Sequence, residues 1–159
     1  MRKNGKQAGT SPPWTLVGAH GGAGTSTLVT LLNHQASAPR AVEYTGGTLP
    51  VDHRVAVVTS STATGTQRTA QMLAGWPREL PRPVLLVRAA DPFGLPPMSR
   101  YQLKAISTEV DAVIRVPYLF VLRQLDVSAA LTSSSRAARL AQLLRRRMRA
   151  LPADAGRRP

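Results

Sequence analysis

The sequence predicts an α/β fold, with a doubly wound, mainly parallel sheet and flanking helices. Three observations predict it. Continuous apolar runs at 54–60 and 83–90 are typical of parallel strands that are covered on both faces. Segments of helical periodicity alternate with such runs along the chain. A glycine-rich turn at 21–24 joins the first strand to the first helix.

The first half of the chain is expected to contribute two buried strands and two helices. The first helix is expected because Leu28, Leu31 and Leu32 fall at helical spacing after a start rich in hydroxyl groups. In order, we expect a strand at 14–19, a helix at 25–35, a connection at 36–53 with at most a short strand at 41–45, a strand at 54–60 and a helix at 67–75.

The second half repeats the alternation and ends in a long helix. Right-handed crossovers between parallel strands are expected throughout. The predicted elements are a strand at 83–90, a loop at 91–97, a helix at 99–107, a strand at 110–117, a short helix at 118–125 and a helix at 133–151 that ends before Pro152.

Composition restricts the classes of site and partner. The chain has no cysteine, which excludes disulfides and thiolate metal sites. No secretory signal is recognised, and Arg115 and Pro117 interrupt the longest apolar run, so we expect a cytoplasmic protein with no transmembrane segment. The net charge of +13 favours nucleic acid, an acidic partner protein or peripheral contact with an acidic membrane, and the oligomeric state stays open.

The glycine-rich turn, with its surrounding residues HGGAGTST at 20–27, is the main candidate site. Strand, glycine-rich turn and helix together bring main-chain N–H groups and a helix N-terminus onto one anion. Gly21, Gly22 and Gly24 let the backbone approach a phosphate closely because they carry no Cβ. The candidate nucleotide- or anion-binding residues are His20, Gly21, Gly22, Ala23, Gly24, Thr25, Ser26 and Thr27.

This loop resembles the deviant phosphate loop (Walker A motif) of the ParA/MinD-type ATPases, a SIMIBI-class family of P-loop proteins. In that comparison His20 takes the place of the signature lysine and Thr25 that of the phosphate-binding lysine. Ser26 takes the place of the hydroxyl that binds magnesium, so it is the metal candidate if a magnesium nucleotide binds. The likeness covers roughly residues 14–126 and implies ATP or ADP with Mg²⁺ as the cofactor.

The departures from the family pattern predict that catalysis has been lost. Both lysines are replaced, and Glu43 and Asp52 are the acids between the first helix and the strand at 54. Phosphoryl transfer depends on placed positive charge and on Mg²⁺. We therefore expect no catalytic residue, and either no cofactor or weakly bound nucleotide. His20, if protonated, or an arginine at 88, 115 or 123 is a candidate substitute for the lost charge, and a purely structural loop is the alternative.

The resemblance divides the chain into three parts: a flexible basic tail at 1–13, a P-loop-like α/β domain at 14–127, and a basic amphipathic helix and tail at 128–159 packed on that domain. The last helix places leucines and Met148 on one face and arginines on the other. The candidate nucleic-acid-binding residues are Arg139, Arg145, Arg146, Arg147 and Arg149. A membrane-surface helix and a solvated outer face are the alternatives.

The functional hypothesis is a non-catalytic ParA/MinD-like accessory protein that acts in plasmid or chromosome maintenance or transfer, with weak nucleotide or anion binding retained. The process follows from the resemblance alone. The alternatives are a basic nucleic-acid-binding protein that uses the fold as a scaffold, and an atypical NTPase.

The histidines at 20, 34 and 53 lack metal-ligand spacing. The hydroxyl-rich run at 59–66 is expected at the edge of the sheet where such folds bind ligands.

Overall fold

The computed structural model describes residues 12–157, so most of the predicted tail at 1–13 lies outside the described residues. In this part of the chain a five-stranded, all-parallel sheet runs in the order β2-β1-β3-β4-β5. The strands are β1 (Trp14–Gly18), β2 (Ala41–Glu43), β3 (Arg54–Ser60), β4 (Val84–Arg88) and β5 (Ala112–Val116).

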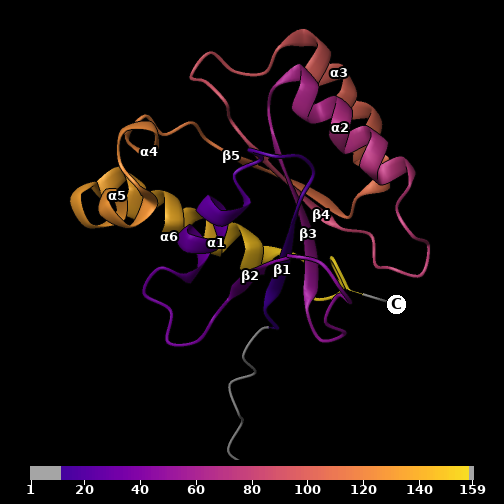
Figure 1. Ribbon diagram of the computed structural model, residues 1–159, viewed down its shortest axis with the longest axis horizontal. Helices are drawn as coiled ribbons and strands as arrows, with labels where there is room; N and C mark the ends of the chain where they lie inside the picture. The colour runs from indigo at the N-terminus through magenta and orange to yellow at the C-terminus, as the bar shows by residue number, and fades with distance from the viewer. Residues whose placement is uncertain (1–11, 158–159) are drawn as a thin grey trace, which may run out of the picture.

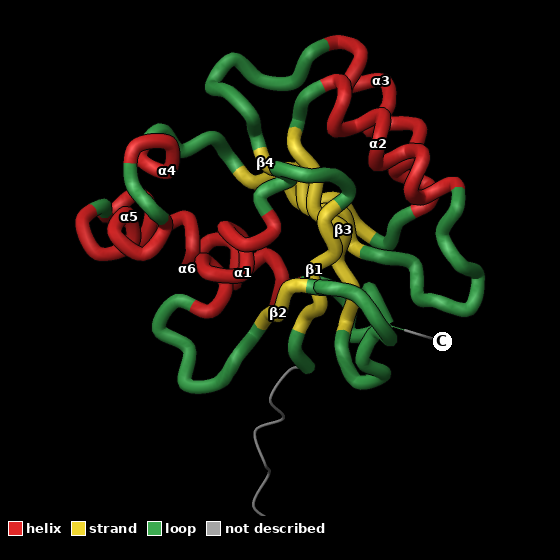
Figure 2. Tube along the Cα trace, in the orientation of Figure 1, coloured by secondary structure: helices red, strands yellow, loops and turns green. Residues whose placement is uncertain are grey.

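Helices cover both faces of the sheet, which confirms the doubly wound α/β prediction. Figure 1 shows α1, α4, α5 and α6 on one side of the strands and α2 and α3 on the other, and Figure 2 shows the same two layers. The helices are α1 (Thr25–Asn33), α2 (Ala63–Ala74), α3 (Pro97–Ile106), α4 (Val121–Gln124), α5 (Val127–Ser133) and α6 (Ser135–Ala150), with a 3-10 turn at Ser107–Glu109. Within residues 12–157, no helix combines the length and apolar character needed to span a bilayer.

Two apolar cores result, one on each face of the sheet. Strand β3 lies between them, and all seven of its residues are buried. Its alternate side chains point to opposite faces, so Val58 joins the core beneath α1 and α6 while Val57 joins the core beneath α2 and α3. Burial on both faces explains why β3 has a continuous apolar sequence instead of an alternating one.

Two helices differ most from the sequence prediction, while α1, α3, α4 and α6 differ from it by up to three residues at an end. Helix α2 begins at Ala63, four residues before the predicted start, because the Thr62 hydroxyl accepts a hydrogen bond from the Gly65 N–H at 3.0 Å. Helix α5 was not predicted. Its start is capped by Asp126, whose carboxylate accepts from the Ala129 N–H at 2.9 Å, and its hydroxyl-rich end resembles a linker in sequence.

The segment after α6 folds back across the amino ends of the strands. Arg54 is buried at the start of β3, where its Nε donates to the Ala155 carbonyl at 2.7 Å and its Nη2 to the Pro152 carbonyl at 2.8 Å. The guanidinium stacks over the Trp14 ring at 4.1 Å. Burial, then the charge of Arg157, lowers the pKa of Arg54, while Asp154 and Asp111 oppose that shift. We call residues 152–157 with Arg54 the C-terminal clasp.

Replacing Arg54 by Met should lower the free energy of unfolding by about 2–3 kcal/mol, because two carbonyls lose a charged donor while the apolar stem is retained. Urea denaturation measures the change. Arg78→Met, at an exposed arginine, is the control and should change stability by less than about 0.5 kcal/mol. Equal stability of the Arg54 variant and the native chain would show that the clasp does not stabilise the fold.

Candidate anion-binding cavity at the glycine-rich loop

The glycine-rich loop connects the end of β1 to the start of α1. Gly22 and Gly24 have φ angles of 77° and 94°, a backbone conformation that favours glycine. Gly24 is the N-cap of α1, and no side chain accepts a hydrogen bond from the first turn of that helix. The N–H groups of the first turn are therefore free of side-chain partners, which is the condition for binding an anion there.

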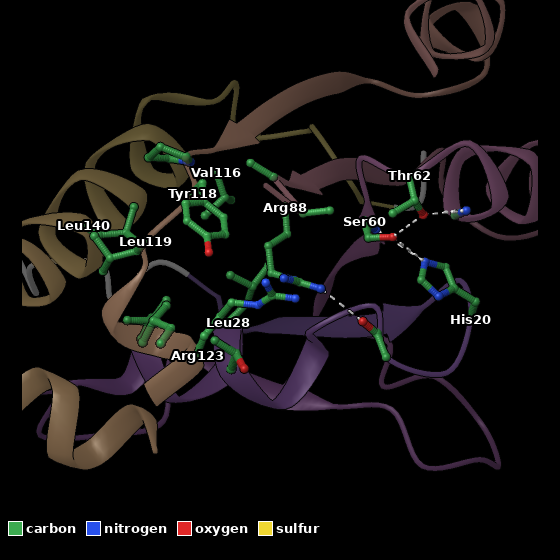
Figure 3. Close-up of a pocket in the computed structure, with 18 of the residues that line it drawn as sticks. His20, Leu28, Ser60, Thr62, Arg88, Val116, Tyr118, Leu119, Arg123 and Leu140 are labelled. Atoms are coloured by element: carbon green, nitrogen blue, oxygen red, sulfur yellow. Dashed lines mark hydrogen bonds between the residues drawn. The ribbon is translucent and has the colours of Figure 1, made fainter. Parts of the chain in front are cut away.

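A cavity of about 400 Å³ adjoins this loop at the carboxyl ends of the strands. The strand order changes direction between β1 and β3, and the cavity lies there, between the loop after β1 and the turn after β3. Ligands of open α/β sheets bind at such a position. Figure 3 shows His20, Ser60 and Thr62 at one end of the cavity, Tyr118, Leu119 and Leu140 at the other, and Arg88 and Arg123 between them.

Arg88, the last residue of β4, holds the loop against the sheet. Its Nε donates to the Ala23 carbonyl and its Nη2 to the Gly22 carbonyl, both at 3.1 Å. A guanidinium carries five N–H donors, so three remain for another acceptor. Arg88 is half-buried and lines the cavity.

The charge of Arg88 is not balanced by a neighbouring acid. Burial, and then the charge of Arg123, lowers the pKa of Arg88, and no carboxylate contributes to it. Two guanidinium groups therefore face one cavity without a counterion among the described residues. An anion that binds between them would stabilise both charges.

Gly24 is required by this arrangement. A Cβ at position 24 would lie 2.4 Å from Nε and 2.7 Å from Cδ of Arg88. Arg88 thus crosses directly over Gly24. The positive φ of Gly24 is a second reason why this position favours glycine. The last glycine of the motif serves the contact with Arg88 as well as the curvature of the loop.

His20 connects the loop to β3. Its Nδ1 donates to the Gly21 carbonyl at 2.8 Å, and its Nε2 accepts from the Ser60 N–H at 3.3 Å. Both contacts are satisfied by the tautomer that carries its proton on Nδ1. The Ser60 hydroxyl also lies 3.3 Å from Nε2, longer than the 2.6–3.2 Å typical of a nucleophile and its base. The geometry indicates a positioning contact.

Half of the eight predicted loop residues line the cavity: His20, Gly21, Gly22 and Thr27. Ala23 and Thr25 are buried beneath the loop, and the Thr25 hydroxyl lies 2.7 Å from where a Cβ on Gly18 would be. Ser26, the metal candidate, is exposed and lies outside the lining. Among residues 12–157, no group of three or more His, Asp or Glu side chains is placed to hold a metal ion.

The structure distinguishes among the three arginines that the sequence left open. Arg88 and Arg123 line the cavity, whereas Arg115 is exposed on β5 and lines other cavities. The hydroxyl-rich run after β3 contributes Ser60, Thr62 and Thr64 to the lining. The position of Arg88 at a strand end was readable in the sequence, but its contact with the loop joins residues more than sixty positions apart.

The five arginines of α6 that the sequence singled out fall into two groups. Arg139, Arg146 and Arg149 are exposed, and their side chains have no hydrogen bond within residues 12–157. Arg145 donates to the His34 carbonyl at 2.9 Å, and burial, followed by the charges of Arg40 and Arg149, lowers its pKa. Arg147 donates to the Arg115 carbonyl at 2.8 Å. Arg145 and Arg147 therefore each use a donor for a main-chain carbonyl of the domain, and Arg147 stays exposed.

Comparison with known protein families finds no family model that matches the chain, and a search of curated proteins finds no match either. The resemblance to the ParA/MinD-type ATPases therefore rests on the loop and on the strands that follow it.

Gly65 provides a test of the contact between His20, Ser60 and α2. A Cβ there would lie 2.4 Å from the Ser60 hydroxyl, 2.8 Å from its carbonyl and 2.9 Å from Nε2 of His20. Gly65→Ala should lower the free energy of unfolding by about 1–3 kcal/mol, although alanine is the better helix former. Chemical denaturation measures the change.

Gly75, at the other end of α2, is the matched control. A Cβ there would be at least 3.8 Å from its nearest neighbours, and its φ is −96°. Gly75→Ala should leave stability unchanged or raise it by up to about 1 kcal/mol. If the two variants behaved alike, the close approach at Gly65 would be disproved.

Proposed function

We propose that this chain is a non-catalytic ParA/MinD-like accessory protein that binds a phosphate-bearing ligand, in the first place a nucleotide, in the cavity beside the glycine-rich loop. The observation that carries the proposal is the pair Arg88 and Arg123, which face this cavity without a carboxylate contributing to the pKa of Arg88. A role in plasmid or chromosome maintenance or transfer follows from the resemblance of the loop.

A phosphate group suits the donors of this cavity. Guanidinium groups bind phosphate oxygens through two parallel N–H bonds, and both Arg88 and Arg123 line the cavity. Arg88 is already held by two carbonyls, so ordering it costs little when a ligand binds. The apolar end of the cavity, formed by Leu119, Leu140 and the ring of Tyr118, is suited to an uncharged part of the same ligand.

Hydrolysis is not part of the proposal. Turnover needs a bound metal ion and a group that positions water. The Ser26 hydroxyl lies outside the cavity lining, and no acidic cluster for a metal is present among residues 12–157. Binding without turnover is the activity that these residues support.

Calorimetric titration with ATP, ADP and pyrophosphate, with and without Mg²⁺, tests binding. We expect a measurable affinity that depends little on Mg²⁺, and Arg123→Gln should weaken it about tenfold or more through loss of a charged hydrogen bond. Arg78→Gln removes the same charge from an exposed site outside the cavity lining and should leave the affinity unchanged.

Three outcomes would contradict the proposal. Absence of binding to all three compounds, or equal weakening by Arg123→Gln and Arg78→Gln, would exclude the cavity as the site. Mg²⁺-dependent ATP turnover above about one per minute would contradict the non-catalytic part of the proposal. Ordinary enzymes turn over at roughly 1–10³ per second, so slower rates than this threshold are negligible beside theirs.

A second candidate function, nucleic-acid binding, is favoured by α6. Arg139, Arg146 and Arg149 are exposed on this helix, and its sequence, SRAARLAQLLRRRMRA, contains no acid. Most of its large apolar residues, Leu140, Leu144 and Met148, are buried in the core, while Leu143 is exposed. A membrane helix would need those residues exposed, so phosphate-backbone contact is the better-supported role for this surface.

The double substitution Arg139→Gln and Arg146→Gln should weaken binding to a mixed-sequence DNA duplex and flatten the salt dependence by up to about two units, because fewer counterions are released. Fluorescence anisotropy between about 50 and 200 mM salt measures both. Arg68→Gln with Arg78→Gln is the matched control, on and after α2. If both double substitutions weakened DNA binding equally, α6 would not be a specific DNA-binding surface and would contribute only through the net charge of the chain.

A further inference from the structure

Strand β5 is an edge of the described sheet, opposite β2. Main-chain groups alternate in direction along a strand, and the Ala89 N–H bonds the Val116 carbonyl, so Val116 faces β4. Val113 and Arg115 therefore direct their main-chain groups away from the sheet. The Arg115 carbonyl accepts from Nη1 of Arg147 at 2.8 Å, which agrees with that direction.

An open groove of about 910 Å³ follows this edge between α3 and α6. Leu103, Val113 and Leu151 give it an apolar lining. A second cavity of about 420 Å³, at the carboxyl end of β5, shares Arg100 and Arg115 with it. The groove is thus an exposed strand edge bordered by apolar side chains, the surface to which extended polypeptides bind by adding a strand.

The groove is strongly basic. Four cationic side chains line it, and no acidic residue is among the described residues that do: Arg100, Lys104, Arg115 and Arg147. This charge complements an acidic segment. A second copy of the chain is disfavoured as the occupant of the groove, because it would place four cations against four. The basic sequence before Pro12 is disfavoured as the occupant because it too would bring positive charge to the groove.

We propose that the β5 edge binds an acidic, extended segment of a partner protein, which adds a strand beside β5. The main-chain groups of Val113 and Arg115 would pair with that strand, and its outward carboxylates would meet the four cations. When the new strand pairs with the Arg115 carbonyl, the guanidinium of Arg147 is released to bind a carboxylate of the partner. A polypeptide is favoured over nucleic acid because the apolar lining and the main-chain donors match a strand.

The test uses two capped eight-residue peptides, one alternating valine with glutamate and one alternating valine with lysine. We expect the glutamate peptide to bind at least about tenfold more tightly than the lysine peptide. Amide hydrogen exchange at Val113 and Arg115 should slow about tenfold or more on binding, because strand pairing protects these N–H groups. Charge attraction without strand pairing would leave that exchange unchanged and would overturn the proposal.

Two variants locate the site. Val113→Pro removes an N–H that faces away from β4, a position where edge strands tolerate proline, and should abolish binding. Lys104→Glu, on the exposed side of α3, should weaken binding about tenfold without altering the strand, and Arg68→Glu, at an exposed position of α2 outside the groove, is the control. Full binding by Lys104→Glu would contradict the proposal. If the native chain self-associates and Val113→Pro does not, the edge binds a second copy of the chain instead. If the native chain binds duplex DNA and Lys104→Glu does not, the edge binds nucleic acid instead.

Discussion

The contact between Arg88 and the glycine-rich loop determines the geometry of the candidate site. It fixes two loop carbonyls, requires a glycine at position 24 and brings a guanidinium to the cavity wall. The chain has 21 Lys and Arg residues against 8 Asp and Glu, so most of its cations have no acidic partner of their own. Arg54, like Arg88, bonds main-chain carbonyls. A carbonyl satisfies the donors of an arginine without neutralising its charge, so the positive potential remains available to ligands.

The parallel sheet brings the separate parts of the site together. All five strands end at the same edge, so the loop after β1, the turn after β3, the last residue of β4 and the segment after β5 meet there. Among residues 12–157 the strand order leaves β5 without a neighbouring strand on its outer side. The cavity at the carboxyl ends of the strands and the groove along β5 therefore belong to different parts of one sheet.

The sequence predicted the parts of the fold that depend on local pattern. Strand β3 was predicted with its observed bounds because burial on both faces gives an unbroken apolar run. Helix α5 was missed because its end, rich in Ser and Thr, resembles a linker, and its cap depends on Asp126. The glycine motif identified the loop as the candidate site, but it did not distinguish between an anion site and a structural turn.

Contacts between residues far apart in the chain could not be predicted from the sequence. Helical periodicity placed Arg145 beside the polar face of α6, yet its Nη1 donates to carbonyls at the end of α1, more than one hundred residues earlier. Arg147 likewise bonds β5. A helical projection shows the direction of a side chain from its own axis, whereas the carbonyls of a neighbouring element decide whether that side chain remains available.

The C-terminal clasp has a consequence for how the chain folds during synthesis. Arg54 completes its packing only with residues about one hundred positions later, and Gly156 bonds both Val55 and Asp111. Such distant contacts raise the contact order of the fold. Closing the long loops between them costs chain entropy before the contacts can stabilise the folded state. The amino ends of β1 and β3 therefore stay uncovered on the ribosome until residue 156 has emerged, and during that interval the nascent chain depends on its helices to shield the sheet.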